Sequence, residues 1–305
     1  MIYLIISILI ASSLFVIFKL FSTFKINTAQ AIVVNYLIAF LFGFYNSETS
    51  TTLLQIPQQS WFIGAFILGI LFIAIFNVMG ITAQKNGLAV ASVAGKMSVT
   101  IPIIFGVFLY DESIGFIKTI GVLLALTSVY LASAKSDTAS VNLKDLKYPI
   151  LLFLGSGCID TLLKYMEISY VSKSAIPMFL ATIFGCAFIF GCFFMALQVL
   201  KASILDKKIK SIQRKQETEQ KGKQIIKNII GGIVLGIPNY YSMAFLIKAL
   251  KTEGLESSTL FTINNVSVVI LTTIFALLFF KEKLVKKNWI GIGLAVISIL
   301  VVASA

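Results

Sequence analysis

Three charged residues lie inside apolar segments of this 305-residue chain: Lys96, Asp160 and Lys164. They are the first candidates for binding or proton transfer. Asp160 and Lys164 are four residues apart in the stretch GCIDTLLKYM, so on a helix they share one face with Ser156 and Glu167. A carboxylate in such a place can exchange a proton, and an ammonium group can bind an anion.

The energetics of burial decide which way this pair faces. A charge at the centre of a membrane helix costs about 2.5–3.5 kcal/mol, whereas an exposed pair four residues apart returns only about 0.2–0.5 kcal/mol. Asp160 and Lys164 are therefore expected to face a polar interior. Two roles stay open for them, lining a solvated substrate path or forming an internal salt bridge, and Lys96 either pairs with Asp160 or meets an anionic substrate.

Uncharged polar residues in other apolar segments add candidates for substrate binding. Together with the three charged residues we select Asn77, Tyr240, Tyr241, Asn264 and Asn265. Pro238 removes a backbone donor just before the two tyrosines, so we expect the helix to open there and act as a hinge. Glu112 and Glu282 lie at helix junctions, where a capping or gating role is expected.

Several kinds of chemistry are excluded or disfavoured by composition. The chain has no histidine, which removes histidine-based acid–base catalysis and the commonest zinc sites. Its three cysteines, Cys158, Cys186 and Cys192, fall in apolar segments and are interpreted as small buried hydrophobes. No phosphate-binding P-loop motif occurs, so no ATPase is built in. We expect no enzyme activity, no cofactor and no metal.

The elements that must position these residues are membrane helices. Hydrophobic residues make up 58% of the chain, charged residues only 12%, and the mean hydropathy is +0.96. Apolar stretches of about 20 residues, each long enough to cross a bilayer core, recur ten times. We predict an all-α integral membrane protein with ten transmembrane helices, at about 1–21, 29–45, 61–82, 88–109, 115–133, 148–168, 175–199, 228–248, 257–280 and 288–304.

The distribution of basic residues predicts the orientation. Nineteen of the 25 Lys and Arg residues fall in the connections on one side of this arrangement, which marks that side as cytoplasmic and places both termini outside. Nine of them belong to the hydrophilic stretch 201–227, which we interpret as a basic loop lying against anionic headgroups. A regulatory or partner-binding helix is the alternative for this stretch.

An internal repeat divides the chain into halves. Residues 108–133 match 278–303 at an offset of 170, with identities that include Glu112/Glu282, Gly121/Gly291 and Ser128/Ser298. Gly87-Leu88 matches Gly254-Leu255, and Ser12–Lys19 runs parallel to Gly157–Lys164. We predict a first five-helix repeat over 1–134, a connecting loop over 135–147 and a second five-helix repeat over 148–305. Because five is odd, the second repeat enters the membrane from the opposite side, so the repeats are inverted.

The helix–Glu–helix element with a glycine nine residues on, LYDE…TIG and FFKE…WIG, occurs twice in this ten-helix pattern. In this it resembles EamA-type members of the drug/metabolite transporter superfamily, over nearly the whole chain. The resemblance implies transport of a small molecule, with amino acids, sugars, nucleotide conjugates, cations and drugs among the substrates of the family. Members with ten helices are usually described with cytoplasmic termini, the reverse of what the basic residues predict.

These patterns predict a secondary transporter that moves a small polar metabolite across the inner (plasma) membrane by alternating access. The expected partners are the substrate and the lipid bilayer, not nucleic acid, while proton coupling and a homodimer are left open. Two alternatives from other classes are a membrane scaffold that docks a cytoplasmic partner on 201–227 and a membrane-embedded lipid-modifying enzyme. The inverted repeat argues against the first, and the lack of histidine argues against the second.

Overall fold

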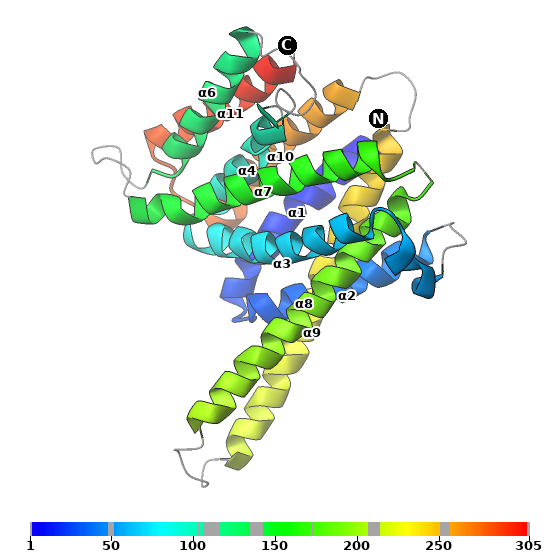
Figure 1. Cartoon of the computed structure of the whole chain (residues 1–305). Coiled ribbons are helices and arrows are strands. Elements are labelled where there is room, and N and C mark those ends of the chain that lie inside the picture. Colours follow the sequence, from blue (N-terminus) through cyan, green and yellow to red (C-terminus); the bar gives the residue numbers. More distant parts are fainter. Residues whose placement is uncertain are drawn as a thin grey trace. The chain divides into compact units, whose positions relative to one another are not determined.

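The computed structural model of the protein describes residues 2–47, 52–102, 104–105, 116–134, 143–172, 174–206, 214–250 and 257–303. Within these residues the chain forms ten α-helices, one short 3-10 helix and no strand (Figure 1). In order, they are α1 (Ile2–Thr23), α2 (Thr28–Tyr45), η1 (Leu53–Gln58), α3 (Phe62–Lys85), α4 (Leu88–Met97), α6 (Phe116–Ala132), α7 (Leu143–Ser169), α8 (Ile176–Asp206), α9 (Arg214–Leu250), α10 (Ser257–Phe280) and α11 (Lys286–Ala303). Each coincides with one of the expected apolar stretches, apart from η1.

Seven of the described helices are long and apolar enough to cross a membrane: α1, α2, α3, α7, α8, α9 and α10. The protein is therefore an all-helical, multi-pass membrane protein. The expected count of ten spans stays a prediction, because two further apolar helical stretches, Leu88–Pro102 with its turn at Ser98–Val99 and Thr119–Ala132, are shorter.

The first correction concerns the stretch 201–227, which is not the loop that we expected. α8 has 31 residues and α9 has 37, or about 46 and 55 Å at the helical rise, against a bilayer core of about 30 Å. Their apolar spans cover only Ile176–Gln198 and Gly222–Leu246, so both helices continue beyond the membrane segment (Figure 1). Only 207–213 lie outside the described residues here. Similarly, α7 begins at Leu143, inside the expected connecting loop.

The second correction concerns the expected single helix over 88–109. α4 ends at Met97, and a turn at Ser98–Val99 separates it from the helical residues that follow. The cause is Pro102, which has no amide hydrogen for the Ser98 carbonyl and whose ring collides with that carbonyl in a regular helix. The amide of Ile101 instead donates to the Ser98 oxygen over 2.9 Å, the shorter 3-10 spacing. Residues 106–115, with Glu112, lie outside the described residues.

The third correction concerns Pro238, where we expected the helix to open. α9 runs without a break from Arg214 to Leu250 and keeps Pro238 in its interior. The prediction of an opened helix at this proline is therefore wrong for this conformation. The position still matters, because the division of the chain into two compact units falls between Ile237 and Pro238.

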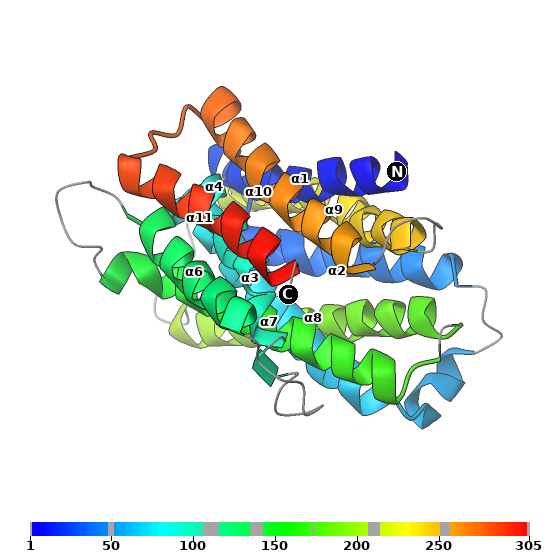
Figure 2. The same cartoon turned by 90° about the horizontal axis from the view of Figure 1, so that it is seen from above.

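The two units are built from both halves of the sequence. Unit 1 comprises Met1–Leu20, Val78–Tyr165 and Pro238–Ala305, and unit 2 comprises Phe21–Asn77 and Met166–Ile237. Inside unit 1, α6 packs along α11 and α4 packs along α10; inside unit 2, α2 packs along α8 (Figures 1 and 2). Each of these pairs joins a helix of the first half to the helix at the same place in the second half.

The closest of these contacts is between α6 and α11. A Cβ atom on Gly291 would collide with the amide nitrogen of Ala132 and lie 2.9 Å from the carbonyl oxygen of Ser128. The Ser298 hydroxyl donates to the carbonyl of Gly121 over 2.8 Å. The pattern is reciprocal: in each contact a serine of one helix lies against a glycine of the other, and the repeat equates the two glycines and the two serines.

The end of α6 is held by a buried amide. The Asn288 side chain donates to the carbonyls of Ala132 and Ala134 over 2.7 and 2.8 Å, and its oxygen accepts from the amide of Val285 over 2.8 Å. Carbonyls at a helix C-terminus have no partner within their own helix, so they need such donors when they are buried. Asn288 thereby joins the end of α6 to the start of α11.

Unit 2 has an aromatic core. Tyr36 of α2 is fully buried, packs on Phe76 and Phe184, and donates its hydroxyl to the carbonyl of Phe72 over 2.9 Å. Near the start of the span of α9, the Asn228 oxygen accepts from the backbone amide of Asn27 over 2.9 Å. This contact fixes α9 to the turn between α1 and α2.

Candidate functional site

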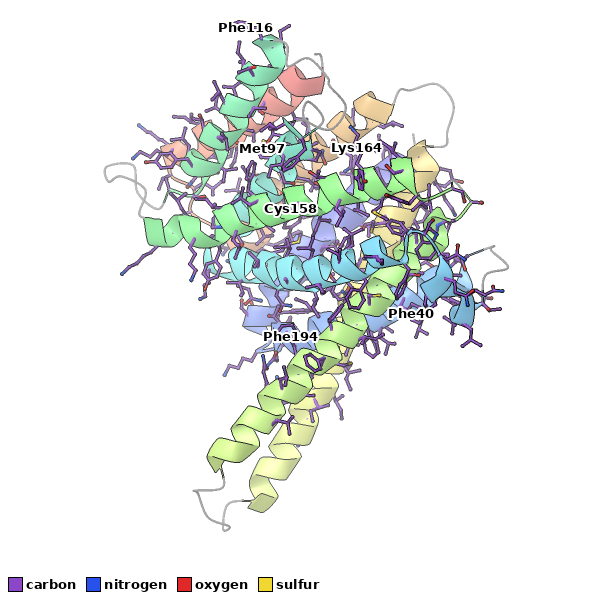
Figure 3. All side chains as sticks on the ribbon, viewed as in Figure 1. Phe40, Met97, Phe116, Cys158, Lys164 and Phe194 are labelled. Atoms are coloured by element: carbon purple, nitrogen blue, oxygen red, sulfur yellow. The ribbon has the colours of Figure 1, made fainter. Side chains whose placement is uncertain are left out.

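The face of α7 that carries Asp160 changes character along the helix. Leu146 and Phe153, at steps of seven residues before Asp160, are buried at 5% and 6% exposure. Asp160 itself is exposed, and so is Lys164 one turn further on, which Figure 3 marks on α7. Steps of seven return to the same side of a helix. The side that packs against neighbouring helices at the start of α7 is therefore uncovered at the level of the two charges.

The broken end of α4 lies against this charged level within unit 1. The Ser98 hydroxyl is 3.2 Å from Oδ2 of Asp160, and Lys96 is near enough to act electrostatically on the same carboxylate. Lys96 is half-buried and occupies the last turn of α4, where a cation is favoured by the helix dipole. The sequence left two partners open for Lys96, Asp160 or an anionic substrate. In the structure Asp160 is close enough to interact with Lys96 electrostatically. Figure 3 marks the neighbouring Met97, which is fully buried.

A second polar group holds the other end of α4. Gly87 is the N-cap residue with φ of +105°, a conformation that favours glycine, and it has no side chain to cap the helix. Glu282 supplies the missing cap: its two carboxylate oxygens lie 3.1 and 3.2 Å from the amide nitrogen of Leu88. The Lys19 ammonium of α1 lies 3.1 Å from the same carboxylate. One acidic side chain therefore joins the end of α1, the start of α4 and the connection between α10 and α11.

We expect Glu282→Ala to lower the stability of the protein by about 1–2 kcal/mol, because it removes a helix cap and leaves Lys19 without this partner. Glu282→Gln keeps an oxygen for the Leu88 amide and should fall between the alanine variant and the parent protein. Melting of the three purified proteins in one detergent measures the order. Equal melting temperatures would mean that Glu282 does not stabilise α4 as a helix cap.

The remaining predicted residues are divided between the units. In unit 1, Tyr240 and Tyr241 are adjacent on α9 with ring centroids 5.2 Å apart, and Tyr241 stacks on Phe245 at 5.8 Å. Asn264 of α10 is buried at 3% exposure, and among the described residues its side-chain oxygen has no hydrogen-bond partner. In unit 2, the Asn77 amide donates to the carbonyl of Ile73 over 2.8 Å.

Two residues of this site escaped the sequence reasoning. Ser98 lies about 200° from Lys96 on a continuous helix and so shares no face with it, and Lys19 enters the sequence argument only through the repeat and the basic residues of the first connection. The available signal was Pro102, since a proline four residues after Ser98 predicts a break at Ser98. For Lys19 the sequence holds no comparable signal.

Comparison with known proteins shows which family part of the chain resembles. The profile of the EamA-like transporter family matches residues 212–304, the region of α9, α10 and α11 that includes Glu282, Asn264 and both tyrosines. This part of the chain is therefore similar to the EamA-like transporter family. This confirms the family resemblance seen in the repeated helix–Glu–helix element, and it favours a transporter over the scaffold and the membrane enzyme.

Similarity to individual proteins extends beyond the EamA-like domain. An uncharacterised protein of Haemophilus influenzae is 28% identical over 298 residues, which cover 95% of this chain and 93% of the relative. A protein of known crystal structure aligns with 97% of this chain and 96% of its own, with a TM-score of 0.50 and 14% identity. The latter likeness shows the fold alone.

Proposed function

We propose that this EamA-like protein is a secondary transporter of a small polar metabolite in the inner membrane. The observation that carries the proposal is the placement of Asp160. A carboxylate inside a membrane-spanning helix is uncovered on the side of α7 that elsewhere packs on protein, with Lys96 within electrostatic reach and Ser98 within hydrogen-bond distance. Intramembrane charges of this kind mark substrate or ion paths.

Alternating access between two inverted five-helix repeats, 1–134 and 148–305, is the mechanism we propose. It is supported by the reciprocal glycine–serine contacts of α6 and α11, because reciprocity is the mark of a two-fold axis. It is also supported by the pairing of α4 with α10 and of α2 with α8. In this mechanism the contact of Glu282 with Lys19 closes unit 1 at the end where the basic connections lie. Substrate reaches Lys96 and Asp160 from the opposite end.

The substrate-binding set that we propose is centred on Asp160, Lys164 and Lys96. Around them we place four further residues of unit 1: Tyr240, Tyr241, Asn264 and Asn265. The unpartnered oxygen of Asn264 supports its place in this set, because a buried polar atom normally finds a partner. A bound substrate would supply one.

A thermal-shift screen of the purified protein against amino acids, sugars and nucleotides tests the proposal. We expect one class to raise the melting temperature, because a ligand at about 100 times its Kd stabilises the folded state by about 2.7 kcal/mol. The shift should be lost in Lys96→Met, which keeps the length of the side chain and removes its charge. If no class stabilises the parent protein, or if the shift persists undiminished in Lys96→Met, this site is not the substrate site.

A further inference from the structure

The Ser98 hydroxyl lies between two oxygen atoms that compete for it. It is 2.7 Å from the carbonyl oxygen of Gly95, three residues earlier in α4, and 3.2 Å from Oδ2 of Asp160 on α7. A serine hydroxyl carries a single hydrogen and two acceptor lone pairs, so it donates fully to only one oxygen at a time. The partner that it chooses depends on whether Asp160 carries a proton.

The two states of Asp160 demand opposite arrangements. An ionised carboxylate is an acceptor only, so a stable contact with Ser98 requires the hydroxyl to donate to Asp160 and to leave Gly95. A protonated carboxyl can donate its own O–H to the Ser98 oxygen, which frees the serine hydrogen for the Gly95 carbonyl. Both arrangements use the same positions of the heavy atoms and differ by rotation of one hydroxyl group.

The location gives this rotation a consequence. Gly95 belongs to the last turn of α4, and Ser98 is the residue at which Pro102 breaks the helix. A serine that donates to the carbonyl three or four residues earlier bends a helix and competes with its backbone bonds. Gain or loss of the bond from Ser98 to Gly95 therefore acts on the end of α4 beside the break.

We propose that Ser98 is a positioning residue that couples protonation of Asp160 to the broken end of α4, by transferring its hydrogen bond between Asp160 and the Gly95 carbonyl. This inference rests on the proposed transport function, which it deepens by naming the proton as the coupled ion. The proton is taken from and returned to water, and no other bond is made or broken.

Charged groups around Asp160 set the background for this exchange. From α4 the charge that acts on Asp160 is that of Lys96, and α7 itself carries Lys164 and Glu167 one and two turns further on. α10, which packs along α4, has no charged or titratable residue between Ser257 and Phe280. Ser98 is thus the uncharged group through which the protonation state of Asp160 affects the backbone of α4.

The test follows the carboxyl stretching band of Asp160 by infrared difference spectroscopy of the purified full-length protein over a pH series, with Asp160→Asn to assign the band. In Ser98→Ala we expect the band to move to higher frequency, because its hydrogen bond is lost. The pH midpoint should rise by about half a unit to one unit, because a bond to a charged acceptor is stronger than one to a neutral group. Ser98→Thr keeps the hydroxyl and should retain the parent band and midpoint.

Ser92→Ala is the matched control, because Ser92 is buried in the same helix and donates to the Ala89 carbonyl over 3.0 Å in the same way. It should leave the band and the midpoint unchanged. A parent-like band and midpoint in Ser98→Ala would overturn the proposal, and so would an equal change in Ser92→Ala. This measurement needs no substrate, so it is separate from the thermal-shift screen: an empty screen with a Ser98-dependent band would reject the transport site and leave the hydrogen-bond exchange standing.

Discussion

Asp160→Asn is expected to leave the protein folded and inserted while its transport activity falls by about 100-fold or loses its dependence on pH. The amide oxygen of asparagine can still accept from Ser98, so the hydrogen bond seen at 3.2 Å is retained. What disappears is the charge and the exchangeable proton, and a bond to a charged group contributes about 1.5–3 kcal/mol. Uptake into proteoliposomes at a series of pH values, normalised to folded protein, measures the change.

The opposite result has a distinct signature. If Asp160 only forms a structural salt bridge, removal of its charge leaves the half-buried Lys96 without its counter-charge and lowers the melting temperature, while the folded molecules still transport normally. Glu167→Gln is the control, because Glu167 is an exposed carboxylate on the same helix seven residues on. It should change neither quantity to a comparable extent.

Gly291→Ala is expected to be strongly destabilising, whereas Gly293→Ala, two residues further along α11, should be neutral or slightly stabilising. A methyl group at 291 meets backbone atoms of Ala132 and Ser128, which cannot rotate away, so α6 and α11 must separate. Overpacking of this kind costs about 1–3 kcal/mol. At 293 nothing lies within 4 Å of the added atom, and alanine is favoured over glycine in a helix by about 0.5–1 kcal/mol.

Melting temperatures and the yield of monodisperse protein for the two variants provide the comparison. Equal behaviour of Gly291→Ala and Gly293→Ala would mean that α6 and α11 do not approach each other as closely as described. Since the same contact carries the reciprocity between the two halves, that result would also weaken the case for an inverted repeat.

The places of the helices could be predicted from sequence because each apolar stretch is long and is bounded by charged or polar residues. Their interruptions were harder to assign. Pro102 and Pro238 are both prolines inside apolar helices, yet α4 ends before the first and α9 continues through the second. Their surroundings differ: a Cβ atom on Gly236, two residues before the second proline, would lie 2.9 Å from the carbonyl oxygen of Asn35 on α2, whereas α4 ends beside the exposed level of α7. The sequence pattern of one segment does not show which other helices will pack against it.

The candidate site shows the same limit. Asp160, Lys96 and Glu282 could be selected from sequence because a charge in or beside an apolar segment is costly and therefore informative. Their partners Ser98, Leu88 and Lys19 were harder to select, because small hydroxyls, backbone amides and helix-end lysines are common everywhere. Pro102 marks Ser98 as the place of a break, but not as a partner of Asp160. Which of them meet a given carboxylate is decided by how α1, α4 and α7 pack within unit 1.

The continuation of α8 and α9 beyond their apolar spans has a practical consequence for imaging. A membrane protein of 33.4 kDa offers electron microscopy little mass outside the detergent or lipid belt. Asp206 ends one helix and Arg214 begins the next, both several residues beyond the membrane segments. A compact helical protein inserted between them, in phase with both helices, would be joined through continuous α-helix and not through flexible linkers. The particle would thereby gain a rigid marker for alignment on the basic side of the bilayer.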